Sequence, residues 1–309
     1  MPQQRQDGSN GSRRDDNAAF QVVRDKPAMR EIVKAWGGQR LRIGVVPTMG
    51  ALHRGHLTLL DRARLSCDRI VVSIFVNPTQ FGPNEDFAAY PRDEAGDLDK
   101  LRNAGADLVW MPGVAAMYPP GYATEVLVRE LGDGLCGEFR PGHFSGVATV
   151  VPKLLLQTGA DQAFFGEKDY QQLQVIRRVT TDLDIPTEIV GVETVREADG
   201  LALSSRNAYL NTAERSQAAT LPKVLRDIAD AAARPSTSLT ALLEAGKAQL
   251  FAAGFSSLDY LRVCDAATLR PVDIVIGPAR VFVAARLGKT RLIDNMPIVA
   301  RSADLPDRR

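Results

Sequence analysis

The stretch LRIGVVPTMGALHRGHLTLLDRARL, residues 41–65, decides the fold. Leu41–Val46 is apolar and strand-like, and Leu57–Leu65 has the pattern of a helix. Two of the chain's three histidines, His53 and His56, lie between them in a glycine-marked turn. Backbone N–H groups at the start of a helix lack partners, and the helix dipole favours negative charge there. The stretch therefore predicts a strand, a phosphate-binding turn and a helix.

Composition indicates a globular chain with no strong electrostatic preference. Its 309 residues suffice for two domains, and 45% of them are hydrophobic and 24% charged. Lys and Arg total 38 against 37 Asp and Glu, so no net field points to nucleic acid or to an anionic membrane. The longest strongly apolar run, Ile70–Val76, is far below the roughly 18–20 residues of a membrane span.

The N-terminus and the cysteines suggest a cytoplasmic protein. Residues 1–17 are polar and charged without an apolar core, so we expect no signal peptide, and residues 1–18 are expected to form a disordered tail. Cys67, Cys136 and Cys264 are odd in number, widely spaced and form no CxxC pair. We therefore expect reduced thiols rather than disulfides or a zinc site.

Strands and helices are expected to alternate between residues 40 and 195. Strand patterns lie at 41–46, 70–76, 108–111, 162–165 and 187–191, and helical patterns at 55–68, 93–104, 147–156 and 171–182. Such alternation predicts right-handed βαβ units and a parallel sheet, which binds ligands beyond the carboxyl ends of its strands.

The composition changes after about residue 207. Alanine-rich helical patterns cover 212–233 and 239–253, and strand patterns follow near 259–264, 280–286 and 291–294. The fold class is therefore expected to be α/β, with a parallel-sheet domain followed by a smaller α+β C-terminal domain.

Each candidate motif has a plainer alternative. The two histidines between residues 49 and 56 could simply cap a helix or form half a metal site, although the HExxH spacing is missing. GEKDYQQ, residues 166–172, offers Lys168 to a phosphate or carboxylate, but could be only a charged helix start. Leu203–Asn207 offers two hydroxyls and a guanidinium, or is a polar linker.

Two further segments are equally ambiguous. Asn77–Phe81 places amides after a buried strand, where they suit hydroxyl or carbonyl groups, yet Asn-Pro alone favours a turn. The glycine-rich segment 134–146 carries Arg140 and His143, and is either a mobile lid or a long turn.

The order of the motifs is more specific than any one of them. His-x-Gly-His after the first strand resembles the nucleotidylyltransferase superfamily, and Leu203–Arg206 is similar to its KMSKS-type loop. The full set resembles the pantothenate synthetase (pantoate–β-alanine ligase) family from about residue 40 to 295. It comprises VPTMGALH (46–53), FVNP (75–78), YPR (90–92), FFGEKDYQQ (164–172), READGLA (196–202) and SSRN (204–207).

This resemblance implies an activity and an architecture. The family uses ATP, with Mg²⁺, to join pantoate to β-alanine through a pantoyl adenylate, and releases AMP and pyrophosphate. It implies a Rossmann-like domain over residues 19–195, a smaller lid domain over 196–309, a cytoplasmic homodimer and no tightly bound organic cofactor. Neither nucleic acid nor a membrane is an expected partner.

The resemblance also assigns residues. Catalysis falls to His53, His56 (as proton donor), Lys168 and Arg206, which would neutralise charge as the pantoate carboxylate meets the α-phosphate. Gln80, Gln172, Asn77 and His143 would bind substrate. ATP binding falls to Met49, Gly50, Ala51, Leu52, His53, Arg54, Gly55, His56, Gly166, Glu167, Lys168, Asp169, Val195, Leu203, Ser204, Ser205 and Arg206.

Two positions depart from the family pattern, and two other functions compete. Leu203 stands where Met is common, and Gly96-Asp97 stands where some relatives carry consecutive aspartates. Asp97 is thus the candidate metal contact, with ATP oxygens and water expected to supply most ligands. An adenylyltransferase that leaves AMP on its substrate, or a catalytically silent nucleotide-binding regulator, would share the nucleotide loops.

Overall fold

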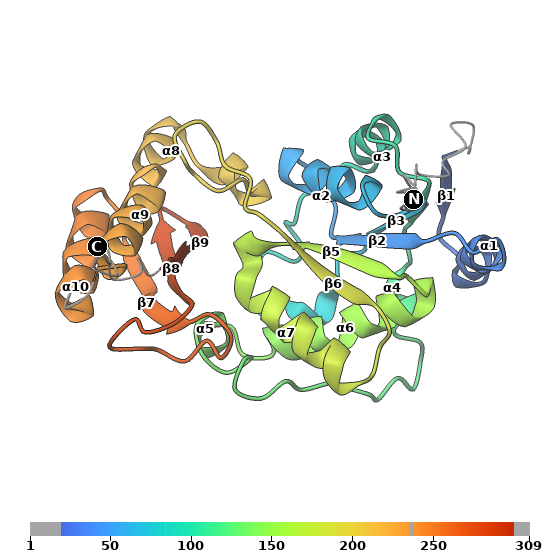
Figure 1. Cartoon of the computed structure of the whole chain (residues 1–309). Helices are drawn as coiled ribbons and strands as arrows, with labels where there is room; N and C mark the ends of the chain where they lie inside the picture. Colours follow the sequence, from blue (N-terminus) through green and yellow to red (C-terminus); the bar gives the residue numbers. More distant parts are fainter. Residues whose placement is uncertain (1–19, 84, 235–237, 300–309) are drawn as a thin grey trace, which may run out of the picture.

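Two sheets organise the chain (Figure 1). The computed structural model describes residues 20–83, 85–234 and 238–299. The tail expected over residues 1–18 lies outside these ranges. A six-stranded parallel sheet is flanked by helices on both faces, and a three-stranded antiparallel sheet follows it in the chain. The predicted fold class is confirmed.

The parallel sheet has the strand order β1-β4-β3-β2-β5-β6. Its elements are β1 (Gln21–Val23), α1 (Lys26–Gly38), β2 (Ile43–Thr48), α2 (Arg54–Arg64), β3 (Arg69–Ile74), α3 (Glu94–Asn103), β4 (Leu108–Trp110), α4 (Val114–Met117), α5 (Cys136–Phe139), α6 (His143–Thr158), β5 (Gln162–Gly166), α7 (Tyr170–Asp182) and β6 (Glu188–Val192). The strands and helices expected between residues 40 and 195 are all present, with bounds that differ by a few residues.

Burial on both faces explains why the central strands are continuously apolar. Successive side chains of a strand point to opposite faces. Val45 therefore packs in the core formed with Trp36 and Leu154, whereas Val46 packs on the other face with Leu60.

The topology fixes where a ligand can bind. The chain leaves β2 for β3 on one side and returns as β5 on the other side of β2. This reversal is a switch point, where the loops after adjacent strands diverge and leave a crevice. The turn after β2 and the GEKD segment after β5 both begin there.

The start of the described chain adds elements that the sequence analysis did not predict. Asp25 accepts a hydrogen bond from Ala28 N–H at 3.3 Å and caps α1. Met29, Val33 and Trp36 then form its buried stripe at helical spacing.

The antiparallel sheet packs between two layers. It comprises β7 (Ser257–Asp265), β8 (Ala279–Leu287) and β9 (Thr290–Ile298), preceded by α8 (Thr212–Ala218), α9 (Thr220–Ala232) and α10 (Leu239–Ala252). One face packs on α9 and α10. Tyr260 and Phe282 on the other face join a core with Phe144 and Val175 of the parallel-sheet domain.

The helix expected over residues 212–233 is divided into α8 and α9. Pro222 lies in the first turn of α9 and cannot donate a hydrogen bond back to the preceding turn. The interruption therefore follows from the missing N–H. The exact domain boundary near residue 196 stays a prediction.

Within the described residues, the helices are all too short or too polar to cross a membrane. Cys67, Cys136 and Cys264 all lie in the described part of the chain, where they are buried and form no disulfide.

Candidate active site

A cavity of about 240 Å³ opens at the carboxyl ends of β2 and β5. The walls of this cavity are formed by early and late segments of the parallel-sheet domain and by the loop that follows the domain in the chain. Of the expected site residues, those that line it are Met49, His53, Gly55, His56, Asn77, Gln80, His143, Gly166, Lys168, Asp169, Gln172, Val195, Leu203, Ser204, Ser205 and Arg206. Gly50, Ala51, Leu52, Arg54, Glu167 and Asp97 are not among its lining residues.

The backbone of the turn after β2 has two consecutive positive φ angles, and the Asp97 carboxylate holds it in this conformation. Gly50 and Ala51 have φ values of +84° and +52°. A Cβ at Gly50 would lie 3.1 Å from Asp97 Oδ2, so a glycine is needed there. Asp97, only 2% exposed, accepts Ala51 N–H through Oδ2 and Leu52 N–H through Oδ1, both at 2.8 Å. These two hydrogen bonds favour a loop-holding role for Asp97 over the metal contact that was expected.

The two histidines of this turn hydrogen-bond to the backbone at the start of α2. Gly55 N–H donates to His53 Nδ1 at 3.1 Å, and His53 N–H donates to His56 Nδ1 at 3.3 Å. The imidazoles lie 4.1 Å apart between ring centroids. Gly55 is required because a Cβ there would come within 2.9 Å of the His53 ring. The capping alternative is therefore correct, and it coexists with a place in the cavity wall.

This geometry sets the charge and tautomer of both rings. A neutral imidazole that accepts at Nδ1 carries its proton on Nε2. Burial, with smaller contributions from nearby Lys168, lowers the pKa of His53 to about 4. Burial and the neighbouring His53 lower the pKa of His56 to about 3. At neutral pH both rings are uncharged Nε2–H donors.

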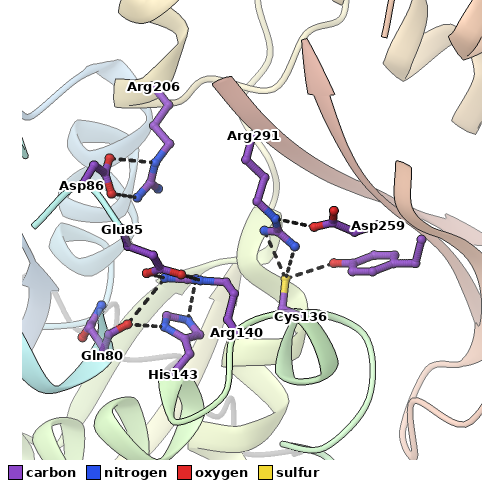
Figure 2. Close-up of polar contacts among 10 residues, drawn as sticks. Gln80, Glu85, Asp86, Cys136, Arg140, His143, Arg206, Asp259 and Arg291 are labelled. Atoms are coloured by element: carbon purple, nitrogen blue, oxygen red, sulfur yellow. Dashed lines mark hydrogen bonds and ion pairs between the residues drawn. The ribbon is translucent and has the colours of Figure 1, made fainter. Parts of the chain in front are cut away.

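His143 belongs to a buried polar network (Figure 2). Its Nδ1 donates to Gln80 O at 2.8 Å, and its Nε2 lies 3.0 Å from Arg140 Nη1. Arg140 in turn grips the Glu85 carboxylate through Nε at 2.6 Å and Nη2 at 2.7 Å. Burial, and then the charge of Arg140, lowers the pKa of His143 to about 4. With both ring nitrogens engaged, His143 holds the Gln80 turn and is less suited to bind substrate directly.

The Asn77 side chain also makes hydrogen bonds within the protein. Its Oδ1 accepts from the Tyr118 hydroxyl at 2.8 Å, and its Nδ2 donates to Gln80 Oε1 at 3.2 Å and to Gly146 O at 3.3 Å. Gln80 Nε2 then lies 3.3 Å from Met49 Sδ, and a thioether is a weak acceptor. Asn77 thus positions the Gln80 amide, whose Nε2 is available to a better acceptor.

The adjacent glutamines of α7 have different roles. Gln171 is buried, accepts from Cys136 N–H at 3.0 Å and donates to Leu131 O and Gly134 O. Gln172, one position on, lines the cavity. Of the pair, Gln172 is therefore the one that a molecule in the cavity can reach.

The cations of the site are paired with carboxylates. Lys168 Nζ lies 3.7 Å from Asp169 Oδ2. Arg206 grips Asp86 through Nε at 3.2 Å and Nη2 at 2.9 Å (Figure 2). Burial alone would raise the pKa of Asp169, but Lys168 and Arg206 outweigh it and lower that pKa. The site therefore holds charged groups of both signs side by side.

The two candidate phosphate-binding loops, the turn after β2 and the Leu203–Arg206 segment, lie close together. Leu203 N–H donates to Val195 O at 2.9 Å, and Ser204 Oγ accepts from Arg206 N–H at 3.3 Å. The position of a Cβ on Gly55 would be 3.8 Å from Leu203 Cβ, so the second loop lies directly over the first.

A second cavity of about 480 Å³ adjoins the first between the two sheets. It shares Arg140, Lys168, Asp169, Ser204 and Arg206 with the first cavity. Arg286 of β8 and Lys289 of the turn between β8 and β9 also line it. A polyanion in the first cavity could therefore extend toward the C-terminal domain.

Several wall residues were missed from the sequence. Val147, Val150, Val151 and Leu154 of α6 form an apolar wall, and Tyr90, Glu193 and Thr194 add polar groups. The apolar spacing of α6 was visible, but periodicity does not distinguish a core position from a cavity wall. Glu85 and Asp86 carried no signal, because their partners are remote in sequence.

Comparison with known proteins agrees with this geometry. The family described as pantoate-beta-alanine ligase matches residues 21–297. The pantothenate synthetase of Paramagnetospirillum magneticum is 55% identical over 282 residues, which cover 91% of this chain and 99% of the relative. That of Rhizorhabdus wittichii is 55% identical over 279 residues, with 90% and 99% covered.

Solved structures show the same fold. Pantothenate synthetase from Thermus thermophilus superposes with a TM-score of 0.85 at 46% identity, covering 90% of this chain and 99% of that chain. The pantoate-beta-alanine ligase of Francisella tularensis, complexed with beta-gamma ATP and beta-alanine, gives 0.76 at 35% identity, with 90% and 97% covered. With the fold, the cavity and these matches in agreement, the chain belongs to the pantoate–β-alanine ligase family.

Proposed function

We propose that this chain condenses (R)-pantoate with β-alanine at the expense of ATP, giving pantothenate, AMP and pyrophosphate. One observation carries the proposal: a single cavity combines two phosphate-loop candidates with two amide side chains, Gln80 and Gln172. The loops suit a nucleotide, and the amides suit the hydroxyl and carboxylate oxygens of pantoate.

The first step joins two anions. A pantoate carboxylate oxygen attacks the α-phosphorus of ATP, the bond from that phosphorus to the bridging oxygen breaks, and pyrophosphate leaves. Lys168 and Arg206 would balance the charge, and the neutral rings of His53 and His56 would donate Nε2–H to phosphate oxygens. Burial lowers the pKa of His56 to about 3, so the ring is uncharged before the nucleotide binds, and His56 stays the proposed proton donor once phosphate charge lies beside it.

The second step forms the amide. The uncharged amine of β-alanine attacks the acyl carbon of pantoyl adenylate, the acyl–oxygen bond breaks, and AMP leaves with the electron pair while the nitrogen loses a proton. Acyl adenylates hydrolyse readily, so the apolar wall of α6 would help to keep water from the intermediate.

Magnesium enters as MgATP. Mg²⁺ commonly binds one or two carboxylates together with substrate phosphates and water. Asp169 lines the cavity beside Lys168, whereas Asp97 is occupied by backbone amides. We therefore propose Asp169 as the carboxylate that faces the metal–nucleotide complex.

Three finer points are also proposals. The family resemblance supports a homodimer, a cytoplasmic location and a C-terminal domain that closes as a lid. The cavity shared between the two sheets supports the last of these, because Arg286 and Lys289 also line it.

Isotope exchange tests the mechanism. Pantoate, ATP and Mg²⁺ without β-alanine should support exchange of labelled pyrophosphate into ATP, and mass spectrometry should detect pantoyl adenylate. Adding β-alanine should release free AMP and pantothenate. Exchange that strictly requires β-alanine would exclude the adenylate route, and AMP retained on the product would favour an adenylyltransferase.

A further inference from the structure

Two consecutive polar residues of β9, Asp294 and Asn295, are each only 3% exposed. They lie outside the walls of both cavities described above. Burying polar groups is costly unless they are hydrogen-bonded. Their contacts therefore show what these residues do.

Asn295 holds the backbone on both sides of Lys168. Its Nδ2 donates to Glu167 O and to Lys168 O, both at 2.9 Å. These carbonyls belong to the two peptide groups that flank the Lys168 Cα. Fixing both peptide planes fixes the direction of the Cα–Cβ bond, and hence where the ammonium group can reach.

Asp294 holds the segment that leads into the second loop. Arg196 donates to it through Nη1 at 2.7 Å and Nη2 at 3.0 Å. Arg196 pairs with Ala202 in a short antiparallel bridge, and Leu203 follows directly. Because the bridge is short, the position of Arg196 sets that of Leu203–Arg206.

A third contact strengthens the first. Arg280 of β8 donates to Glu167 Oε2 through Nη1 at 3.1 Å and Nη2 at 3.0 Å. Its guanidinium carbon lies 3.9 Å from the centroid of the Tyr170 ring. The antiparallel sheet thus grips the Glu167–Asp169 turn through both a side chain and the backbone.

We propose that Asp294 and Asn295 are positioning residues that hold the Lys168 segment and the Leu203–Arg206 loop at a fixed separation. Adjacent side chains of one strand point to opposite faces, so a single rigid strand contacts both loops. This inference rests on the proposed function, in which Lys168 and Arg206 act together on the phosphates. When two groups stabilise the same transition state, catalysis depends on their relative position, and one rigid strand that contacts both segments keeps that position fixed.

A double-mutant cycle tests the proposal. Asn295→Asp keeps the side-chain volume but turns an oxygen toward the two carbonyl oxygens. A misplacement of about 1 Å can cost roughly 100-fold, so pyrophosphate exchange should fall by about that factor. In a Lys168→Ala background the same substitution should cost less than about threefold, because the group it positions is gone.

A merely structural role gives a different result, since a lower folded fraction reduces the rate by the same factor in both backgrounds. Arg262→Gln is the matched control. Arg262 of β7 pairs with Glu138 of α5 at 2.9 Å, also between the two domains but outside both cavities, so exchange should stay near wild type. If Asn295→Asp does not fold, Arg280→Gln tests the same turn through Glu167 and should show the same non-additivity.

The outcomes separate the two levels of the argument. Wild-type exchange in Lys168→Ala would overturn the proposed role of that lysine. If Lys168→Ala slows exchange and Asn295→Asp still lowers the remaining rate by about 100-fold in that background, the positioning role alone is overturned. Wild-type exchange in Asn295→Asp would overturn it as well.

Discussion

Replacing Asp97 by Asn should destabilise the ligand-free protein and slow adenylate formation. An Asn side chain can accept Ala51 N–H or Leu52 N–H through Oδ1, but its Nδ2 then faces the other N–H, donor against donor. A hydrogen bond to a charged group is worth about 1.5–3 kcal/mol, and an unpaired buried amide costs about 1–3 kcal/mol. Since the remaining bond also weakens, we expect a loss of about 2–4 kcal/mol in the free energy of unfolding.

The loss should extend to activity through the backbone of the turn. A non-glycine residue with positive φ, such as Ala51, is strained by about 1–3 kcal/mol and persists only while its surroundings hold it. Once the carboxylate is gone, Ala51 can relax toward negative φ and displace His53, two positions on. We expect pyrophosphate exchange to fall at least about tenfold, because the nucleotide loop loses its geometry.

Urea denaturation in the presence of EDTA, paired with the exchange assay, measures both effects. Asp99→Asn is the control: Asp99 lies on the same helix, is 72% exposed and pairs with Arg102 at 2.7 Å, so the change should stay within about 0.5 kcal/mol. If Asp97 were instead a metal ligand, Asp97→Asn would leave the metal-free stability unchanged and raise the Mg²⁺ requirement. That result would refute the loop-holding role.

Four further outcomes are expected. The pKa of each of the three histidines is lowered to about 3–4, so between pH 6.5 and 4 the unfolded chain binds more protons than the folded protein. The free energy of unfolding, measured by urea titration, should therefore decrease as the pH is lowered from about 6.5 to 5.5. The decrease should be smaller after all three histidines are replaced by Gln. Gln172→Ala should raise the KM for pantoate without changing the melting temperature, whereas Gln171→Ala should lower the melting temperature, because three hydrogen bonds are lost. Leu203→Met should leave exchange nearly unchanged, since volume-conserving apolar swaps cost under about 1.5 kcal/mol. Arg206→Ala should slow single-turnover adenylate formation more than it weakens pantoate binding, and the reverse result would place Arg206 on pantoate.

The sequence predicted what depends on local pattern. The βαβ alternation required a parallel sheet, and the site followed from it, because the loops after β2 and β5 must lie at the same edge. The break between α8 and α9 was also within reach, since Pro222 was visible in the sequence. The short strand β1 was not, because three residues carry too little periodicity to detect.

Side-chain roles were harder to predict, because residue type does not reveal the partner. Asn77, His143 and Asp97 were expected at the substrates or the metal, which stays a prediction, and each also makes hydrogen bonds that hold a neighbouring segment. Residue type alone does not distinguish a polar side chain that supports a site from one that touches the ligand, because the partner is set by the fold. Asn295 illustrates the converse, since nothing local marks a strand residue whose partner lies 127 positions away.

The charge balance of the cavity bears on how the two substrates of the proposed reaction are distinguished. Arg140, Arg206 and Lys168 each lie beside a carboxylate, namely Glu85, Asp86 and Asp169. A monoanion that displaced one of these carboxylates would exchange one ion pair for another and gain little, because the freed carboxylate must be solvated again. A triphosphate can contact several of the cations at once, so its charge exceeds what any single pair gives up. Within the proposed function, we infer that the cationic side of the cavity takes the nucleotide in preference to pantoate. The amides of Gln80 and Gln172 would then hold pantoate by hydrogen bonds, which carry no full positive charge to neutralise the carboxylate that must attack.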